Sequence, residues 1–160
     1  ANGDHHAVPV ITQNVDDLHL RAGPAGVIRL HGSIWELRCR GRACGASWRD
    51  ERVPLATMPP RCPSCGSVAR PAVVWFGEPL LEADIHAALQ ACACDVFVTI
   101  GTSAVVYPAA GLVPEAPRLG AYTAEINAER TPASSAVDLA IEGPAEEILP
   151  RLDAFLRALP

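Results

Sequence analysis

The chain has 160 residues, with 13 Lys and Arg against 18 Asp and Glu and a formal net charge of −5. This negative charge argues against non-specific nucleic-acid binding. Because no apolar run approaches the roughly 20 residues of a membrane helix, we expect no membrane-spanning segment. No secretory signal is recognisable near the N-terminus, so a cytoplasmic protein is expected.

Short apolar runs alternate with helical patterns along most of the chain. Helices are predicted at residues 16–23, where Asp16 and Asp17 would cap the helix, and at 81–92, 107–115 and 145–159. Strands are predicted at residues 8–12, 27–30, 72–76, 95–100, 121–126 and 139–141. Alternating strands and helices are typical of α/β proteins with a parallel sheet. We therefore expect a Rossmann-like, doubly wound parallel sheet.

Residues 33–72 differ from the rest, because Gly, Pro, Arg and Cys dominate and no periodicity persists. Such a segment cannot build its own hydrophobic core and needs a cross-link, such as a structural metal ion or disulfides, to hold it folded. Its four cysteines form two closely spaced pairs that suit tetrahedral zinc: Cys39 with Cys44, and Cys62 with Cys65. A chance cluster or disulfides are the alternatives. We expect a small structural zinc module at 33–72, inserted in a domain made of residues 1–32 and 73–160.

Turns and arginines accompany the cysteine pairs. Gly45 and Gly66 follow the second cysteine of each pair, where tight turns can aim backbone amides at sulfur. Cys92 and Cys94 lie elsewhere and are expected to be buried core residues. Six arginines could form either a solvated surface or a patch for acidic partner segments: Arg38, Arg40, Arg42, Arg49, Arg52 and Arg61.

Polar residues follow three of the predicted strands. They are Gln13, Asn14 and Asp16 after the first strand, Gly101, Thr102 and Ser103 after the fourth, and Asn127 after the fifth. In open α/β sheets, ligands bind at the carboxyl ends of strands, and such turns suit ribose and phosphate. A single Gly-Thr-Ser turn is weak, but three polar strand ends favour nucleotide binding.

His31 follows the second predicted strand and could act as a general base, since a neutral imidazole accepts a proton. An isolated histidine is more often structural, so spacing alone leaves both roles open. His19 is expected on a helix surface.

Taken in order, these motifs resemble the core of a sirtuin over roughly residues 8 to 159. The motifs are Ile11-Thr12-Gln13-Asn14-Val15-Asp16, Leu30-His31-Gly32, the cysteine pairs, Val73-Val74-Trp75-Phe76-Gly77-Glu78, Gly101-Thr102-Ser103 and Ile126-Asn127. Sirtuins are NAD-dependent protein lysine deacylases. The resemblance implies NAD and zinc as cofactors, acylated lysines of proteins as substrates, and acyl transfer to ADP-ribose with release of nicotinamide.

The resemblance also implies roles for individual residues. His31 would be the catalytic base that draws a proton from the ribose hydroxyls. Residues expected to bind NAD are Gln13, Asn14, Asp16, Gly101, Thr102, Ser103, Asn127 and Ala145. Val74 and Phe76 would line the acyl-lysine tunnel, while backbone through Gly77 pairs with the substrate peptide as an added strand. A plain buried strand at residues 73–76 is the simpler interpretation, and both can hold.

Residues 73–78 and 101–110 look most like bacterial class III sirtuins, which often remove succinyl or malonyl groups as well as acetyl. The family's N-terminal glycine loop and its acyl-recognising Tyr-x-x-Arg pair do not occur in this sequence. We therefore expect the C-terminal part of a sirtuin domain, with little activity alone and an uncovered sheet edge prone to self-association. The alternatives are a catalytically incomplete, zinc-stapled nucleotide-binding or interaction module and a zinc-ribbon nucleic-acid binder, which the negative charge disfavours.

Overall fold

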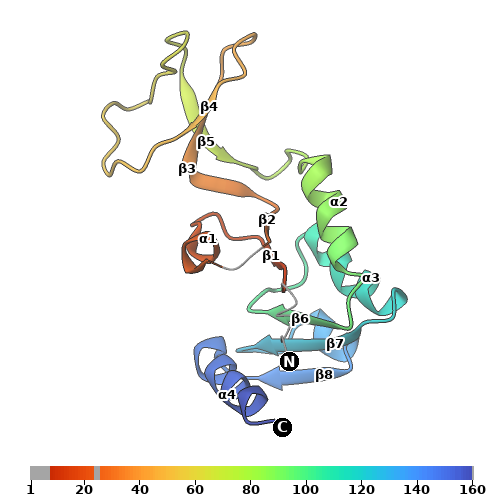
Figure 1. Cartoon of the computed structure of the whole chain (residues 1–160). Coiled ribbons are helices and arrows are strands. Elements are labelled where there is room, and N and C mark those ends of the chain that lie inside the picture. The colour runs from red at the N-terminus through yellow and green to blue at the C-terminus, as the bar shows by residue number, and fades with distance from the viewer. Residues whose placement is uncertain (1–7, 24–25, 160) are drawn as a thin grey trace, which may run out of the picture. The chain divides into compact units, whose positions relative to one another are not determined.

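A computed structural model describes residues 8–23 and 26–159 (Figure 1). The chain forms two compact units, Ala1–His86 and Ala87–Pro160, and the boundary falls inside helix α2 (Glu82–Ala91). The domain division predicted from the sequence, with an insert at residues 33–72, stays a prediction.

The first unit contains a pair of short parallel strands. β1 (Val10–Thr12) lies beside β2 (Val27–Arg29), with helix α1 (Leu18–Ala22) between them in the chain. The Leu30 amide donates to the Thr12 carbonyl at 3.0 Å and carries the pairing one residue further. Both strands lie within the predicted ranges, and the buried Leu30 anchors the end of β2.

A three-stranded antiparallel sheet follows, in the order β4-β3-β5. Its strands are β3 (Gly32–Cys39), β4 (Ser47–Arg49) and β5 (Ala69–Val73). No strand is predicted from the sequence between residues 31 and 71, and this expectation is wrong at β3, at β4 and at most of β5. The predicted strand at 72–76 is also wrong beyond Val73, because β5 ends at that residue, opposite Gly32.

The alternation in β3 is interrupted by a bulge. Ser33 faces Ala72 and Leu37 faces Pro71, so β3 advances four residues while β5 advances one. Bulges re-aim the residues they contain. Here the Ile34 amide donates to the Val15 carbonyl at 2.9 Å. The indole nitrogen of Trp35 donates to the Asp16 carbonyl at 2.7 Å. The bulge thus holds the loop that follows β1.

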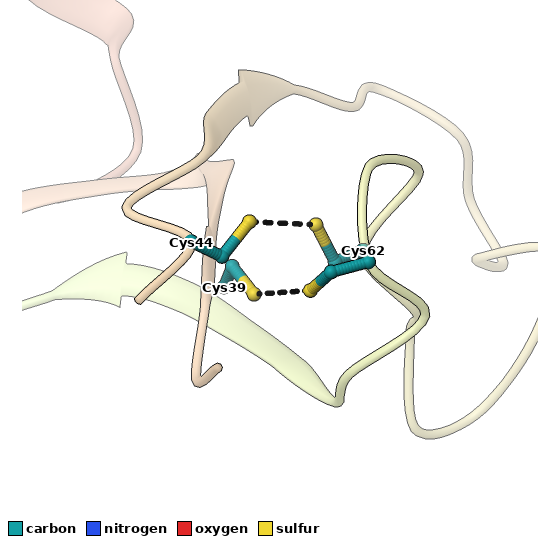
Figure 2. Close-up of side chains that lie close together, drawn as sticks. Cys39, Cys44 and Cys62 are labelled. Atoms are coloured by element: carbon teal, nitrogen blue, oxygen red, sulfur yellow. Dashed lines mark hydrogen bonds between the residues drawn. The ribbon is translucent and has the colours of Figure 1, made fainter. Parts of the chain in front are cut away.

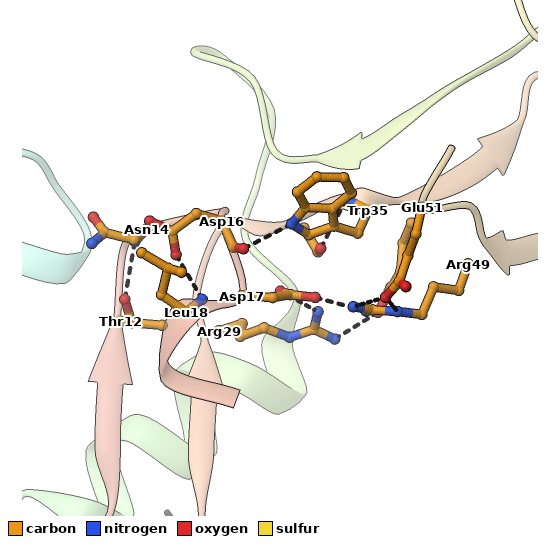
Figure 3. A network of polar contacts seen from close by, with 11 residues as sticks. Thr12, Asn14, Asp16, Asp17, Leu18, Arg29, Trp35, Arg49 and Glu51 are labelled. Carbon is orange, nitrogen blue, oxygen red and sulfur yellow. Dashed lines mark hydrogen bonds and ion pairs between the residues drawn. The ribbon is translucent and has the colours of Figure 1, made fainter. Parts of the chain in front are cut away.

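A cluster of charged side chains around one buried carboxylate fixes the same loop (Figure 3). The Asp17 side chain is fully buried, and its two oxygens accept from Arg29 at 3.1 Å and from Arg49, on β4, at 2.8 Å. Burial alone would raise the pKa of Asp17, but hydrogen bonds from Arg49, Ser33 and Arg29 hold that pKa below its ordinary value. The carboxylate therefore stays ionised and ties β2 and β4 to the start of α1.

The two predicted caps of α1 have different roles. The Asp16 side chain accepts from the Leu18 amide at 2.9 Å, as a cap should. Asp17 makes no capping hydrogen bond and has a left-handed backbone with φ of 61°. Its expected role as a cap is wrong, because its carboxylate is turned inward to the arginines.

The second unit is a parallel sheet in the order β6-β7-β8. Its strands are β6 (Val96–Ile100), β7 (Tyr122–Asn127) and β8 (Leu139–Glu142). Helices α3 (Leu112–Arg118) and α4 (Ala145–Arg157) contact β7, and two short 3-10 turns lie at Ala109–Gly111 and Pro132–Ser135. Parallel strands connected by helices confirm the predicted α/β class.

The outer strand of this sheet exposes apolar side chains. Val96, Val98 and Ile100 share one face of β6 and are 57%, 40% and 42% exposed. Within the described residues, β6 has β7 as its strand partner. Self-association through this edge stays a prediction.

None of the helices in residues 8–23 and 26–159 is long and apolar enough to cross a bilayer.

Replacing Asp17 by Asn should lower the free energy of unfolding by about 2 kcal/mol, because two arginines lose a buried anionic partner. Because the pKa of Asp17 is lowered in the folded protein, its stabilising contribution is fully present at any pH well above the pKa of an unfolded aspartate, about 3.9. The loss measured by urea denaturation should therefore be equal at pH 6 and pH 8. Asp153→Asn, which breaks an exposed pair with Arg157, is the control and should cost less than about 0.5 kcal/mol. Equal losses for the two variants would contradict the account.

Candidate functional site

The four predicted cysteine ligands come together in the first unit. Their sulfur atoms all lie within 4.8 Å of one another. The Cys39 and Cys65 sulfurs are 3.5 Å apart, and those of Cys44 and Cys62 are 3.7 Å apart (Figure 2). Tetrahedral zinc with Zn–S bonds of about 2.3 Å requires sulfur atoms about 3.8 Å apart. The donor set and its spacing therefore fit a structural zinc ion.

Backbone amides stabilise negative charge on these sulfurs. The Gly41 amide donates to the Cys39 sulfur at 3.2 Å. For each of the other cysteines a donor also comes two residues later, at Ala46, Ser64 and Ser67, and Cys62 accepts from the Cys65 amide as well. Hydrogen bonds from the Ser67 side chain and amide lower the pKa of Cys65 to about 6. The predicted turns are present, since Gly45 and Gly66 have φ of 62° and 72°.

The sulfurs lie close to Gly41, where a side chain would fit tightly. A Cβ atom there would lie 3.0 Å from the Ser67 hydroxyl, 3.2 Å from the Cys65 sulfur and 3.3 Å from the Cys39 sulfur. Reasoning from the sequence did not single out this glycine. Its place two residues after Cys39 was the available signal.

His31 lies between β2 and β3 and is half-buried. Its Nδ1 is 3.0 Å from the Gln13 carbonyl oxygen. A carbonyl can only accept a hydrogen bond, so Nδ1 carries a proton, and the neutral tautomer compatible with this contact has its lone pair on Nε2. This is the form that a general base requires.

Two backbone contacts place His31 beside the segment that begins with Val74. Gly32 has φ of 76°, and a Cβ atom there would lie 2.0 Å from the Ala72 carbonyl oxygen. Only glycine permits this approach. The Val74 amide then donates to the His31 carbonyl at 3.0 Å.

The residues after β5 form an exposed turn. Trp75 is 53% exposed and Phe76 is 98% exposed. The interpretation of residues 73–76 as a plain buried strand is therefore wrong beyond Val73. The proposed contacts of Val74, Phe76 and Gly77 with substrate stay predictions. Sequence reasoning also missed Arg70. This buried side chain donates hydrogen bonds to the Val73 carbonyl, just before the turn, and to the Glu78 carboxylate, at its end.

The second unit brings three predicted nucleotide-binding residues together. Gly101, with φ of 59°, and Thr102 follow β6, and Asn127 ends the adjacent β7. The Asn127 side-chain amide donates to the Thr102 carbonyl at 2.7 Å. The Gly101 amide donates to the Ile126 carbonyl at 3.0 Å. The two strand ends therefore form one polar edge, as expected for neighbouring parallel strands.

The other predicted NAD-binding residues are placed as follows. Ser103 is exposed after Thr102, and Ala145 is the first residue of α4. The Gly143 amide donates to the Asn127 carbonyl at 2.8 Å, which brings the turn before α4 to the same edge. Gln13, Asn14 and Asp16 lie in the loop after β1, in the first unit. A single crevice formed by both groups stays a prediction.

Replacing Cys62 by Ser should remove the zinc ion, since three thiolates and a hydroxyl bind it far more weakly. Elemental analysis of the purified protein would measure this loss. Cys94→Ser is the matched control, because Cys94 lies outside the cluster, and it should keep one zinc per chain. Full zinc content in Cys62→Ser would contradict the assignment.

Comparisons with known proteins agree with this geometry. Residues 2–108 match the Sir2 family. A Mycobacterium tuberculosis protein named NAD-dependent protein deacylase is 46% identical over 162 residues, covering 98% of this chain and 67% of the relative. A Pyrobaculum aerophilum protein named NAD-dependent protein deacylase 2 is 48% identical over 144 residues, covering 89% of this chain and 57% of the relative.

Solved structures give the same result. A Sir2 homologue in complex with NAD is 42% identical with a TM-score of 0.87, covering 93% of this chain and 58% of that one. Sir2Af2 bound to a myristoylated histone peptide is 42% identical with a TM-score of 0.78, covering 90% of this chain and 62% of that one. The chain thus spans two thirds or less of these proteins while matching them along most of its own length. It belongs to the Sir2 family.

Proposed function

We propose that this chain carries the catalytic base, the zinc site and part of the NAD site of an NAD-dependent protein lysine deacylase. The observation that carries the proposal is the position of His31. Its Nδ1 is held by the Gln13 carbonyl, so Nε2 is the proton acceptor. Its own carbonyl is bonded to Val74, in the segment proposed to bind the acylated peptide.

NAD would supply an electrophilic ribose carbon, which the carbonyl oxygen of the acyl-lysine would attack as nicotinamide leaves. Gln13, Asn14 and Asp16 would hold the nicotinamide and its ribose, and His31 would accept a proton from the ribose hydroxyls at Nε2. The rest of NAD would be held by the polar edge of the second unit, which consists of Gly101, Thr102, Ser103, Asn127 and Ala145. The carboxyl ends of strands are a common place for nucleotides in such sheets.

The acylated lysine would enter beside the exposed turn after β5. Val74 and Phe76 supply apolar surface for the lysine chain and its acyl group, and the backbone through Gly77 would pair with the peptide. The near-complete exposure of Phe76 supports this role, because a large aromatic side chain in water is available for a partner. The acyl groups to be tested are acetyl, succinyl and malonyl.

The alternative of a catalytically incomplete interaction module is less favoured, because His31 is present and its Nδ1 is oriented by the Gln13 carbonyl. A cytoplasmic location and the absence of nucleic-acid and membrane partners stay predictions.

Deacylation should depend on His31. The assay uses the chain alone and the chain joined to the third of the M. tuberculosis relative that it does not match. His31→Ala should lower turnover of acetyl-lysine peptide by at least about 100-fold, because proton removal loses its base. Zinc content should be unchanged. His19→Ala, on the exposed surface of α1, is the control and should retain turnover.

Release of the deacylated peptide, measured by chromatography, is the readout. Near-normal turnover by His31→Ala would exclude its role as the base. Absence of turnover in both wild-type forms, with NAD and any of the three acyl groups, would contradict the proposed activity of this chain.

A further inference from the structure

Arg70 is the most fully enclosed arginine in the described part of the chain, at 8% exposure. It lies on β5, and one terminal nitrogen donates to the Val73 carbonyl at 2.9 Å. The other donates to both carboxylate oxygens of Glu78, at 2.6 and 2.8 Å. One side chain therefore contacts the beginning and the end of the turn formed by residues 73–78.

The turn is closed by further contacts to the same pair. The Glu78 carboxylate accepts from the Trp75 amide at 3.2 Å, and the Glu78 amide donates to the Trp75 carbonyl at 2.9 Å. The Arg70 guanidinium lies 4.3 Å from the centre of the Trp75 ring, within cation–π range. Arg70 thus contacts three points of a short turn whose apolar side chains face water.

Stability alone is a weak reason for this arrangement. Burying an ion pair costs desolvation free energy that the attraction often only balances. The Arg70 Nε atom is buried and has no hydrogen-bond partner among the described residues, which adds to the cost. What the contacts do supply is a defined backbone path from Val73 to Glu78.

We propose that Arg70 is a positioning residue for acyl-peptide recognition, which fixes the turn at residues 73–78 so that its backbone can pair with the substrate. The proposal rests on the proposed function and extends it to a residue that does not touch the substrate. Arg70 acts through the Val73 carbonyl and the Glu78 carboxylate.

Lysine cannot replace this arginine. A guanidinium presents several N–H groups in a rigid plane, whereas a single ammonium cannot reach Val73 and both oxygens of Glu78 in the same geometry. Arg70→Lys keeps the charge and most of the volume, so it tests position separately from charge.

Arg38 offers a matched control. It faces Arg70 across the β3–β5 ladder and lies 4.0 Å from the same Glu78 carboxylate, but its side chain is 46% exposed. An exposed pair of this kind contributes little. Arg38→Lys should therefore behave like the wild type.

The test measures KM for acetyl-lysine peptide and for NAD in the chain joined to the unmatched third of the M. tuberculosis relative. Arg70→Lys should raise the peptide KM about tenfold, as expected for lost charged hydrogen bonds, and leave the NAD KM and the zinc content unchanged. A peptide N-methylated at one backbone amide should bind the wild type more weakly. N-methylation should raise the peptide KM of Arg70→Lys by a smaller factor, because backbone pairing with the peptide is already impaired in that variant.

The possible failures are distinguishable. If the wild type turns over and Arg70→Lys has the same peptide KM, Arg70 does not position the turn. The same conclusion follows if N-methylation of the peptide raises KM by the same factor in the wild type and in Arg70→Lys. If both KM values and the zinc content change together, its role is general stability and the inference is wrong. If the wild type shows no turnover, the proposed function fails first.

Discussion

The antiparallel ladder between β3 and β5 has the zinc cysteines at one end and His31 at the other. β3 runs from Gly32, directly after His31, to Cys39, and β5 runs from Ala69, shortly after Cys65, to Val73. At the far end the ladder continues as the hydrogen bond from the Val74 amide to the His31 carbonyl. A four-thiolate zinc ion closes its coordination shell and has no open position for chemistry. Its contribution is to hold these two strands in register.

The same strand also holds the loop expected to contact NAD. The bulge in β3 donates to the carbonyls of Val15 and Asp16, and Arg49 on β4 reaches the buried carboxylate of Asp17. The base and this loop are therefore supported by one small sheet. Such a sheet has little apolar core beyond Leu37, which explains why a metal and buried ion pairs stabilise it.

Patterns that depend on neighbouring residues could be interpreted from the sequence. Apolar runs predicted the parallel strands, and the cysteine spacing predicted a metal cluster that the geometry fits. The sheet at residues 32–73 could not be predicted, because the bulge breaks the alternation in β3. The strand β5 contains Ala69, Pro71 and Ala72, which strand propensity disfavours, while the apolar residues 74–76 that favour a strand lie in the exposed turn.

Contacts between residues far apart in the sequence also could not be predicted. Asp17 follows a strand like an ordinary helix cap, and nothing local indicates that its partner is Arg49, which is 32 residues away. Gly32 looked like part of a motif, whereas its requirement comes from the Ala72 carbonyl on another strand. For the NAD residues, the sequence indicates polar strand ends in both units, and their joint arrangement follows from neither unit alone.

Amide hydrogen exchange at Val74 tests most directly whether zinc controls the position of His31. The experiment compares the zinc-loaded chain with the chain after chelation, while α3 and β7 of the second unit serve as an internal reference. Removal of zinc should abolish the protection of the Val74 amide, whose hydrogen bond to His31 ends the ladder, and leave the reference amides protected. Unchanged protection at Val74 in zinc-free protein would show that His31 is held independently of the metal.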